Sequence, residues 1–262
     1  MTASGLGGGA PDDPVALAGI AARMVRPLLV GLDVDGVLAP IVAHADDAEL
    51  LPGVLSAIGR LAAQDGVSVA IVSGRALGDL GRFGFPDDVD VFGTHGLERR
   101  DAPPVRLGDI EQRRYDRLAE LAEVAARRAG DGAWVEIKPA GVVLHVREAP
   151  PETSATSVAE LHRHAEDVTG AHVKAGKSVV ELLARTTSKA TAVTELGAEL
   201  GATAIVFVGD DRTDEEVFVA LGDTDCTIRV GPGDTAAQHR LADPAAVLAF
   251  LDELSDCLAP PA

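Results

Sequence analysis

The stretch Leu28-Leu29-Val30-Gly31-Leu32-Asp33-Val34-Asp35-Gly36-Val37-Leu38 decides how this chain of 262 residues folds. An apolar run of this length, closed by a turn signal, is typical of a buried strand in a parallel sheet. Two carboxylates, those of Asp33 and Asp35, stand where this strand ends. Ligands of open α/β sheets bind at the carboxyl ends of the strands, so the stretch predicts a parallel sheet with a polar site at its edge.

Two further apolar runs also end in polar residues. Residues 204–208 are followed by Gly209-Asp210-Asp211-Arg212-Thr213-Asp214, and residues 67–72 are followed by Ser73-Gly74-Arg75. Lys189 lies in a helix-like stretch between these two motifs, just before the 204–208 run. Because the carboxyl ends of parallel strands meet at one edge of the sheet, we expect these groups to build one site.

The composition is that of a globular chain, with 47% hydrophobic and 24% charged residues. The formal charge of −18 argues against nucleic acid or an anionic membrane surface as a partner. Cys226 and Cys257 are too few for a disulfide framework and lack metal-ligand spacing. Residues 1–13 carry no secretory pattern and charges interrupt the apolar region 15–42, so we expect a cytoplasmic protein without a membrane span.

The order of the predicted elements divides the chain. Strand and helix patterns alternate from residue 28 to about residue 92, which is typical of βαβ units. A helix, hairpin, helix, hairpin pattern follows, which indicates an α+β layer. We therefore predict an α/β fold: a Rossmann-like parallel-sheet core from residues 26–105 and 183–262, an inserted α+β cap at 106–182, and a flexible N-terminus at 1–25. A cap over the strand ends would exclude water and gate access to the site.

The four polar motifs, in this order, resemble those of the haloacid dehalogenase superfamily of phosphatases: Asp-x-Asp-x-Thr/Val, a Ser or Thr, a Lys, and a paired acidic motif. The resemblance implies that Asp33 attacks phosphorus and forms a phosphoaspartyl intermediate. It implies that Asp35 protonates the leaving alkoxide and then activates the hydrolytic water. Ser73 and Lys189 would hold the phosphoryl oxygens.

A magnesium ion belongs to the same expectation. Mg²⁺ prefers hard oxygen ligands and keeps several waters. Asp33, the backbone carbonyl of Asp35, and Asp210 are the predicted ligands. Asp211 and Asp214 are expected to orient these ligands or Lys189 rather than to perform chemistry.

Each motif taken alone has a purely structural interpretation. An Asp-x-Asp pair can be a turn or a helix cap, and Ser73-Gly74 is a common loop dipeptide. Gly209-Asp210-Asp211 can be a turn before a helix that starts near Glu215, with Asp214 as its N-cap. Lys189 can be a solvated helix residue. The ordered combination of all four favours the phosphatase.

Longer stretches carry a more specific signature: residues 33–41, 73–75, 93–98, 136–139, 145–147, 176–181 and 209–218. These are similar to the trehalose-6-phosphate phosphatase family, and the similarity runs from about Leu28 to Leu254. It implies a small-molecule sugar phosphate as the substrate, with the sugar hydroxyls bound by Glu136, Lys138 and Glu181 of the cap.

The physical chemistry of the cap residues agrees with that role. Alternation along residues 134–138 places Glu136 and Lys138 on one face of a strand. Charged hydrogen bonds to several hydroxyls discriminate strongly, because a wrong sugar leaves them unpaired. The alternative interpretation is a solvated charged face of a half-exposed sheet.

Four further residues are candidates with a second interpretation. Arg147, Lys177 and Arg75 can supply positive charge for the phosphate, although surface salt bridges account for them equally well. His95 lies in a Gly-rich loop, where it either contacts the substrate or holds the loop together.

Three positions depart from the family pattern: Val34 replaces a frequent aromatic residue, Val37 the commoner Thr, and Ala190 a usual Gly. None of them removes a group from the expected chemistry.

From the motifs and the resemblance together, we expect a Mg²⁺-dependent phosphatase that hydrolyses trehalose 6-phosphate to trehalose and phosphate. Another disaccharide or pseudo-disaccharide phosphate remains an alternative substrate. A catalytically silent sugar-phosphate-binding protein is the other alternative, although such a protein has no chemical need for both Asp33 and Asp35.

Overall fold

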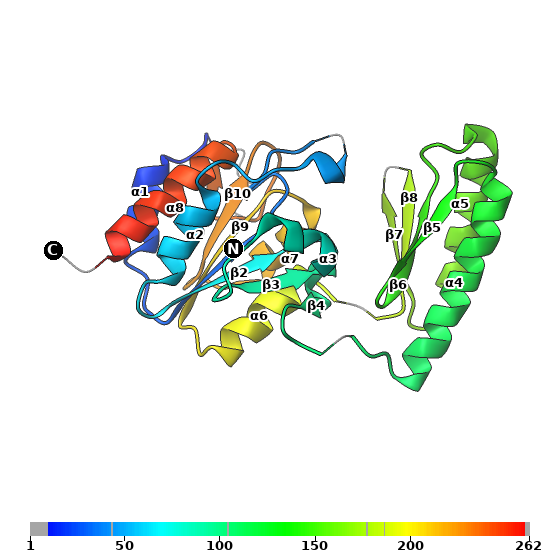
Figure 1. Ribbon diagram of the computed structural model, residues 1–262, viewed down its shortest axis with the longest axis horizontal. Coiled ribbons are helices and arrows are strands. Elements are labelled where there is room, and N and C mark those ends of the chain that lie inside the picture. The colour runs from blue at the N-terminus through cyan, green and yellow to red at the C-terminus, as the bar shows by residue number, and fades with distance from the viewer. Residues whose placement is uncertain (1–9, 43, 104, 177, 186, 260–262) are drawn as a thin grey trace, which may run out of the picture. The chain divides into compact units, whose positions relative to one another are not determined.

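The computed structural model describes residues 10–42, 44–103, 105–176, 178–185 and 187–259 (Figure 1). The chain forms two compact units, residues 103–186 and the rest of the chain. Within the described ranges, none of the helices combines the length and the apolar character that crossing a membrane requires.

The core unit contains a seven-stranded sheet in the order β11-β10-β9-β1-β2-β3-β4. Its strands are β1 (Leu28–Leu32), β2 (Val67–Val72), β3 (Asp90–Gly93), β4 (Glu98–Arg99), β9 (Ala204–Gly209), β10 (Cys226–Val230) and β11 (His239–Leu241). All neighbours pair in parallel except β3 and β4. Leu32 of β1 is level with Ile71 of β2 and Val208 of β9, so the polar residues that follow these strands lie at one edge. The predicted parallel core is confirmed.

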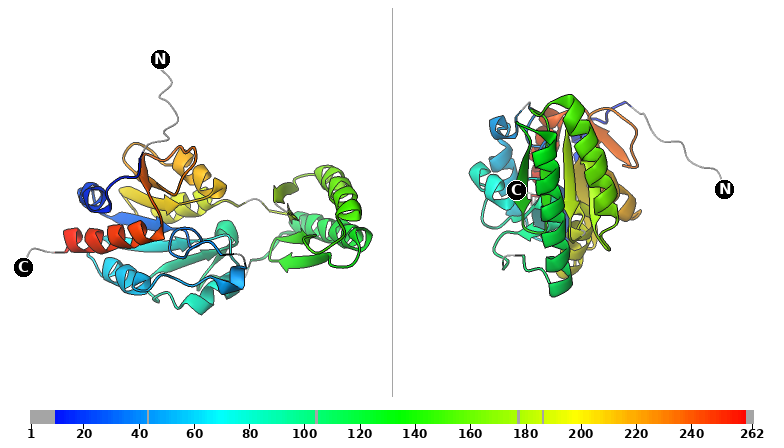
Figure 2. Two further views of the ribbon diagram at one scale, coloured as in Figure 1. Left: turned by 90° about the horizontal axis from the view of Figure 1, so that it is seen from above. Right: turned by 90° about the vertical axis from the view of Figure 1, so that its right-hand side faces the viewer.

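Helices cover both faces of this sheet (Figure 2). Helices α1 (Pro14–Ala21), α2 (Val54–Ala62) and α8 (Pro244–Leu258) pack on one face, and α6 (Lys189–Glu199) and α7 (Arg212–Ala220) on the other. Side chains of β1 therefore alternate between the two faces. Val30 and Leu32 pack in the apolar cluster under α1, α2 and α8, and Leu29 packs in the cluster under α6 and α7. The short helix α3 (Leu77–Leu80) and the 3₁₀ turns Ala45–Asp47, Gly81–Phe83 and Thr94–Gly96 lie in the connections.

The predicted flexible N-terminus at residues 1–25 needs a correction. Asp13 caps α1 by accepting a hydrogen bond from the backbone N–H of Ala16, and Pro14 occupies the first helical position. Leu17, Ala18 and Ala21 are buried, and the helix packs against α8. Burial of this apolar face fixes residues 14–21 as part of the core, whereas residues 1–9 lie outside the described part of the chain.

The inserted unit consists of α4 (Asp109–Ala129), β5 (Trp134–Lys138), β6 (Gly141–His145), α5 (Pro151–Glu166), β7 (His172–Gly176) and β8 (Val179–Leu183). The strands form an antiparallel sheet in the order β5-β6-β8-β7, and both helices pack on one face of it (Figure 1). The other face of the sheet is therefore left for polar side chains. The unit extends past the expected boundary at residue 182 because β8 stays paired to its last residue and Ala184 N donates to Ala140 O at 2.8 Å.

Candidate active site

A tight turn after β1 joins the first and the last polar motif. Val34 O accepts hydrogen bonds from Leu38 N at 2.8 Å and Ala39 N at 2.9 Å. Gly36 lies in this turn with φ +76°, a left-handed conformation that favours glycine. A Cβ atom at Gly36 would lie 2.1 Å from Asp210 Oδ2, so the absence of a side chain lets the Asp210 carboxylate lie against the turn.

Lys189 is buried between two carboxylates. Its Nζ lies 2.8 Å from Asp33 Oδ2 and 2.9 Å from Asp214 Oδ1, and only 1% of its side chain is exposed. Ser188 caps α6 by accepting a hydrogen bond from Thr191 N at 3.1 Å, which makes Lys189 the first residue of the helix. A buried ammonium is tolerated only when it is paired in this way.

Burial sets the protonation of this cluster. It raises the pKa of the Asp33 and Asp214 carboxyl groups above the usual value, while the Lys189 charge lowers it. Burial alone would lower the pKa of Lys189, but the charges of Asp33 and Asp214 raise it above its usual value. Lys189 is therefore a fixed positive charge beside Asp33.

Asp210 is a partly buried carboxylate near this cluster, and the charges of Lys189 and Arg229 only partly offset the effects that raise its pKa. Burial, together with the charges of Asp214 and Asp211, raises its pKa to about 7. No side chain among the described residues donates a hydrogen bond to its carboxylate. A crowded, partly buried carboxylate without a donor is the environment that a bound cation would stabilise.

Asp211 and Asp214 build the start of α7. Asp211 Oδ1 accepts from Thr213 N at 2.7 Å and Asp214 N at 3.1 Å, and Asp214 Oδ2 accepts from Asp210 N at 2.9 Å and Asp211 N at 3.0 Å. The helix thus begins at Arg212 with Asp211 as its N-cap. The alternative interpretation, Asp214 as the N-cap of a helix near Glu215, is wrong because Asp214 is already the third helical residue.

A second group of carboxylates is also close-packed. Oxygens of Asp33, Asp211 and Asp214 lie within 4.8 Å of one another. Lys189 already pairs with two of these residues, and Asp211 caps the helix. An acidic cluster is therefore present at the strand ends, and Lys189 neutralises part of its charge.

Asp35 is held by Arg75, a contact that the sequence analysis did not predict. Arg75 Nε and Nη2 donate to the two carboxylate oxygens of Asp35, each at 2.7 Å, and Arg75 Nη1 donates to Ala45 O at 2.9 Å. The pKa of Arg75 is raised by its hydrogen bond to Asp35. Arg75, considered above as a phosphate contact, pairs with the predicted acid instead. A bidentate pair fixes the position of the Asp35 carboxyl group.

Ser73 and His95 lie together at the end of β2. Ser73 is buried, its carbonyl oxygen accepts from His95 N at 2.9 Å, and the His95 ring packs so closely on Gly74 that a Cβ there would be 2.7 Å away. His95 has φ +55°, a left-handed backbone. Thr187 Oγ1 donates to His95 O at 3.4 Å. The backbone of His95 thus links Ser73 to the residues just before Lys189.

The predicted sugar contacts share the open face of the inserted sheet. Glu136 and Glu181 both lie opposite Val143 of β6, and Lys138 Nζ pairs with Glu181 Oε1 at 3.1 Å. His145 was not predicted as a site residue, yet its Nε2 lies 2.8 Å from Glu136 Oε2. Strand register places them together, and register was the signal that the sequence analysis did not use.

Arg147, another predicted charge of this unit, is not part of that group. Arg147 is exposed after β6 and makes no ion pair with any residue that the structure describes. Lys177 lies outside the described residues.

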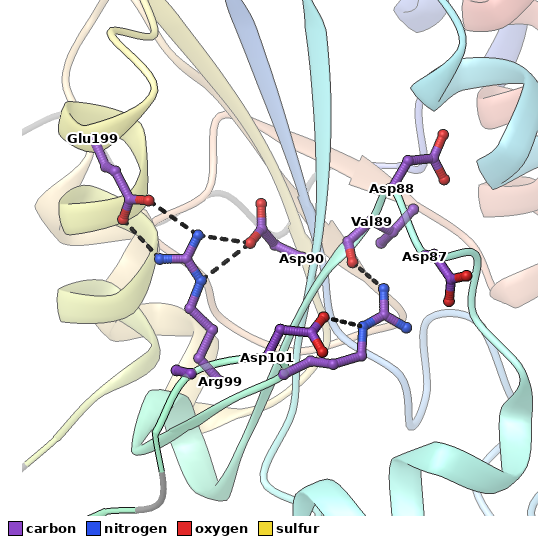
Figure 3. Close-up of a pocket in the computed structure, with 9 residues that line it drawn as sticks. Asp87, Asp88, Val89, Asp90, Arg99, Asp101 and Glu199 are labelled. Atoms are coloured by element: carbon purple, nitrogen blue, oxygen red, sulfur yellow. Dashed lines mark hydrogen bonds and ion pairs between the residues drawn. The ribbon is translucent and has the colours of Figure 1, made fainter.

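A pocket of about 380 Å³ lies elsewhere, around the amino end of β3. Figure 3 shows the Arg99 guanidinium between Asp90 and Glu199, at 2.8 Å and 2.7 Å, and none of the predicted site residues lines this pocket. Arg99 joins β4 to β3 and α6, and the second arginine of the pocket, Arg100, donates to the backbone oxygens of Phe85 and Pro86. The pocket therefore does not compete with the strand-end cluster as the site of chemistry.

Known proteins show the same combination of fold and motifs. A sequence model of the trehalose-phosphatase family matches residues 31–245. The trehalose-6-phosphate phosphatase of Escherichia coli (strain K12) is 32% identical over 234 residues, which cover 86% of each chain. The probable trehalose-phosphate phosphatase of Sinorhizobium fredii is 32% identical over 215 residues, which cover 79% of each chain.

Among solved structures, that of the Aspergillus fumigatus trehalose-6-phosphate phosphatase is similar with a TM-score of 0.70 and 26% identity, covering 95% of this chain and 99% of that one. The chain belongs to the trehalose-phosphatase family, as its motifs predicted.

Proposed function

We propose that this protein is a phosphatase that hydrolyses trehalose 6-phosphate to trehalose and phosphate through a phosphoaspartyl intermediate. The observation that carries the proposal is the buried Lys189 between Asp33 and Asp214, next to an Asp35 that is held by Arg75. A nucleophilic carboxylate paired with a fixed cation, beside a second carboxylate, meets the needs of phosphate ester hydrolysis.

The reaction has two steps. In the first, the Asp33 carboxylate forms a bond to phosphorus while the bond from phosphorus to the sugar oxygen breaks, and protonated Asp35 gives its proton to that oxygen. In the second, Asp35 takes a proton from water as the water oxygen attacks phosphorus, and the bond to Asp33 breaks. Ser73 and Lys189 bind the phosphoryl oxygens throughout. Arg75 holds the Asp35 carboxyl group in place for both proton transfers.

Mg²⁺ is the proposed cofactor, and the donor set supports it. Asp33, the backbone carbonyl of Asp35, and Asp210 offer only hard oxygen donors, and the pKa of the Asp210 carboxyl group is raised by burial and by neighbouring carboxylates. When bound, Mg²⁺ supplies charge stabilisation for the phosphoryl oxygens.

The remaining assignments are proposals on the same basis. Residues 103–186 act as the cap, in which Glu136, Lys138 and Glu181 bind sugar hydroxyls and Arg147 is a further contact. His95 of the core unit is also proposed as a substrate contact. A small-molecule sugar phosphate is the proposed partner, rather than nucleic acid or a membrane surface, because the net charge is −18. The cytoplasm is the proposed location.

Phosphate release from trehalose 6-phosphate, a second disaccharide phosphate and glucose 6-phosphate tests the proposal, with Mg²⁺ and after chelation with EDTA. We expect Mg²⁺-dependent release from trehalose 6-phosphate, and none from the Asp33→Asn variant. Mg²⁺-dependent release confined to another sugar phosphate would reject trehalose 6-phosphate as the substrate but agree with the proposed phosphatase mechanism. Undiminished release by Asp33→Asn would reject the nucleophile.

A further inference from the structure

The open face of the inserted sheet carries an aromatic stack next to Glu136. The Trp134 and His145 rings are parallel, with centroids 4.0 Å apart and an interplanar angle of 3°. The two residues are direct cross-strand partners on β5 and β6, so their side chains stand on the same face. Alternation along β5 puts Glu136 on this face too.

The stack and the carboxylate are connected through the imidazole. His145 Nε2 lies 2.8 Å from Glu136 Oε2, which is hydrogen-bond distance. No other described residue donates to Glu136, so this bond alone fixes the direction of its carboxylate. The orientation of the imidazole plane is in turn set by the indole that covers it.

The indole is an unusual choice for its position. Trp134 is 53% exposed, so about half of this large apolar side chain contributes nothing to burial of apolar surface. It is also the only tryptophan of the chain. Its described contact is the His145 ring rather than the apolar cluster on the other face of the sheet. A role in core packing therefore does not account for it.

We propose that Trp134 and His145 are positioning residues, which hold Glu136 in the orientation that binds a sugar hydroxyl and so determine selectivity among sugar phosphates. The inference rests on the proposed function, because it assigns Glu136 to sugar binding. Trp134 acts through His145, and His145 acts through Glu136. The second Glu136 oxygen is then left to accept from the substrate.

Kinetics of Trp134→Ala, Glu136→Ala and the double variant test this chain of contacts. An aromatic pair is worth about 1 kcal/mol, so Trp134→Ala should raise KM for the best sugar phosphate roughly fivefold, with kcat unchanged. Hydrolysis of p-nitrophenyl phosphate, which has no sugar, should not change. Because Trp134 acts through Glu136, the double variant should have the same KM as Glu136→Ala alone.

Two variants separate positioning from loss of structure. Trp134→Phe keeps a ring against His145 and should restore most of the KM. Ile137→Ala removes a side chain that is 64% exposed on the same strand but on the opposite face, and it should leave KM unchanged. A KM increase in Ile137→Ala equal to that in Trp134→Ala would show a general effect on β5 and overturn the proposal.

The single tryptophan also gives a readout that does not depend on turnover. In the Asp33→Asn variant, saturating trehalose 6-phosphate should change the Trp134 emission, and Glu136→Ala in that background should abolish the change. Unchanged emission at saturation would place Trp134 outside the site.

The outcomes distinguish this inference from the proposed function. If the KM increases of the two single variants multiply in the double variant, Trp134 acts independently of Glu136. That result would overturn the positioning role without affecting the proposal that the protein hydrolyses trehalose 6-phosphate. If wild-type protein instead hydrolyses a different sugar phosphate, the substrate proposal fails, and the same double-variant comparison on that sugar still decides the inference.

Discussion

Gly36 shows how one residue without a side chain assembles the site. It combines a left-handed φ of +76° with the contact to Asp210. The Gly36→Ala substitution should displace the Asp210 carboxylate and lower kcat/KM on the order of 100-fold, the loss that misplacement by about 1 Å produces. The strained backbone should also lower the free energy of unfolding by about 1–2 kcal/mol.

Gly78→Ala is the matched control for this prediction. Gly78 lies in α3 and a Cβ there would meet no atom within 4 Å, so activity should be retained. Steady-state kinetics and urea denaturation of both variants make the comparison. Full activity of Gly36→Ala would mean that the position of Asp210 does not matter for the reaction.

At the residue scale the sequence identified which groups gather but not how they pair. Asp33, Lys189 and Asp210 lie at the carboxyl ends of strands or the start of a helix, and such positions can be read from apolar runs and turns. The Arg75 contact with Asp35 depends on loop geometry between two strands, which no local pattern encodes.

The start of α7 is an element that serves both stability and the site. Asp211 caps the helix through Thr213 N and Asp214 N, and the same capping box holds Asp214 against Lys189. Asp211→Ala should lower the free energy of unfolding by about 1 kcal/mol. It should also lower kcat, because Asp214 loses one of the bonds that orient it.

Asp243 provides the control, since it caps α8 through Ala246 N and belongs to none of the site contacts. Asp243→Ala should cost a similar free energy of unfolding and leave kcat unchanged. Urea denaturation and phosphate release on both variants measure the difference. Equal kcat for the two variants would contradict a role of the capping box in orienting the site.

At the element scale, strands that end in turn signals were predicted well, because burial on both faces makes their apolar runs continuous. Helix α1 was missed. Its eight residues, Pro14 to Ala21, include no charged side chain, and its only signals were the cap at Asp13 and Pro14. What makes it a helix is packing on α8, which is a tertiary contact.

For the whole molecule, the raised pKa of Asp210, about 7, predicts how stability changes with pH. A carboxyl group whose pKa is higher in the folded state keeps a proton that the unfolded chain releases above about pH 4. Its contribution to stability is present at low pH and is lost as the pH rises through about 7. The free energy of unfolding of metal-free protein should therefore fall between pH 5 and pH 8.

Urea denaturation in EDTA across this range tests the prediction, and Asp210→Asn should make the fall smaller without abolishing it, because the pKa values of Asp33 and Asp214 are also raised. Glu111 has the opposite sign, since Arg185 lowers its pKa to about 2, but that contribution changes only below about pH 4.5. If the free energy of unfolding of the metal-free wild-type protein instead increases towards pH 8, ionisation of Asp210 does not destabilise the folded state, and the prediction is wrong.

The two-unit organisation was visible in the sequence because the period of the pattern changes from βαβ units to hairpins. The exact ends of the inserted unit could not be predicted from the sequence. The inserted unit spans residues 103–186, and its ends are set by Arg185, which donates to Glu111 and to the backbone oxygen of Arg106. Such long-range contacts fix where a unit ends without leaving a signal in local composition.

Trapping the covalent intermediate tests the central claim most directly. Protein mixed with trehalose 6-phosphate is quenched in acid and treated with borohydride, which reduces an acyl phosphate to an alcohol, and the peptides are then analysed by mass spectrometry. The account predicts homoserine in place of Asp33 and an unmodified Asp35. Modification at Asp35, or turnover with no modified carboxylate, would contradict it.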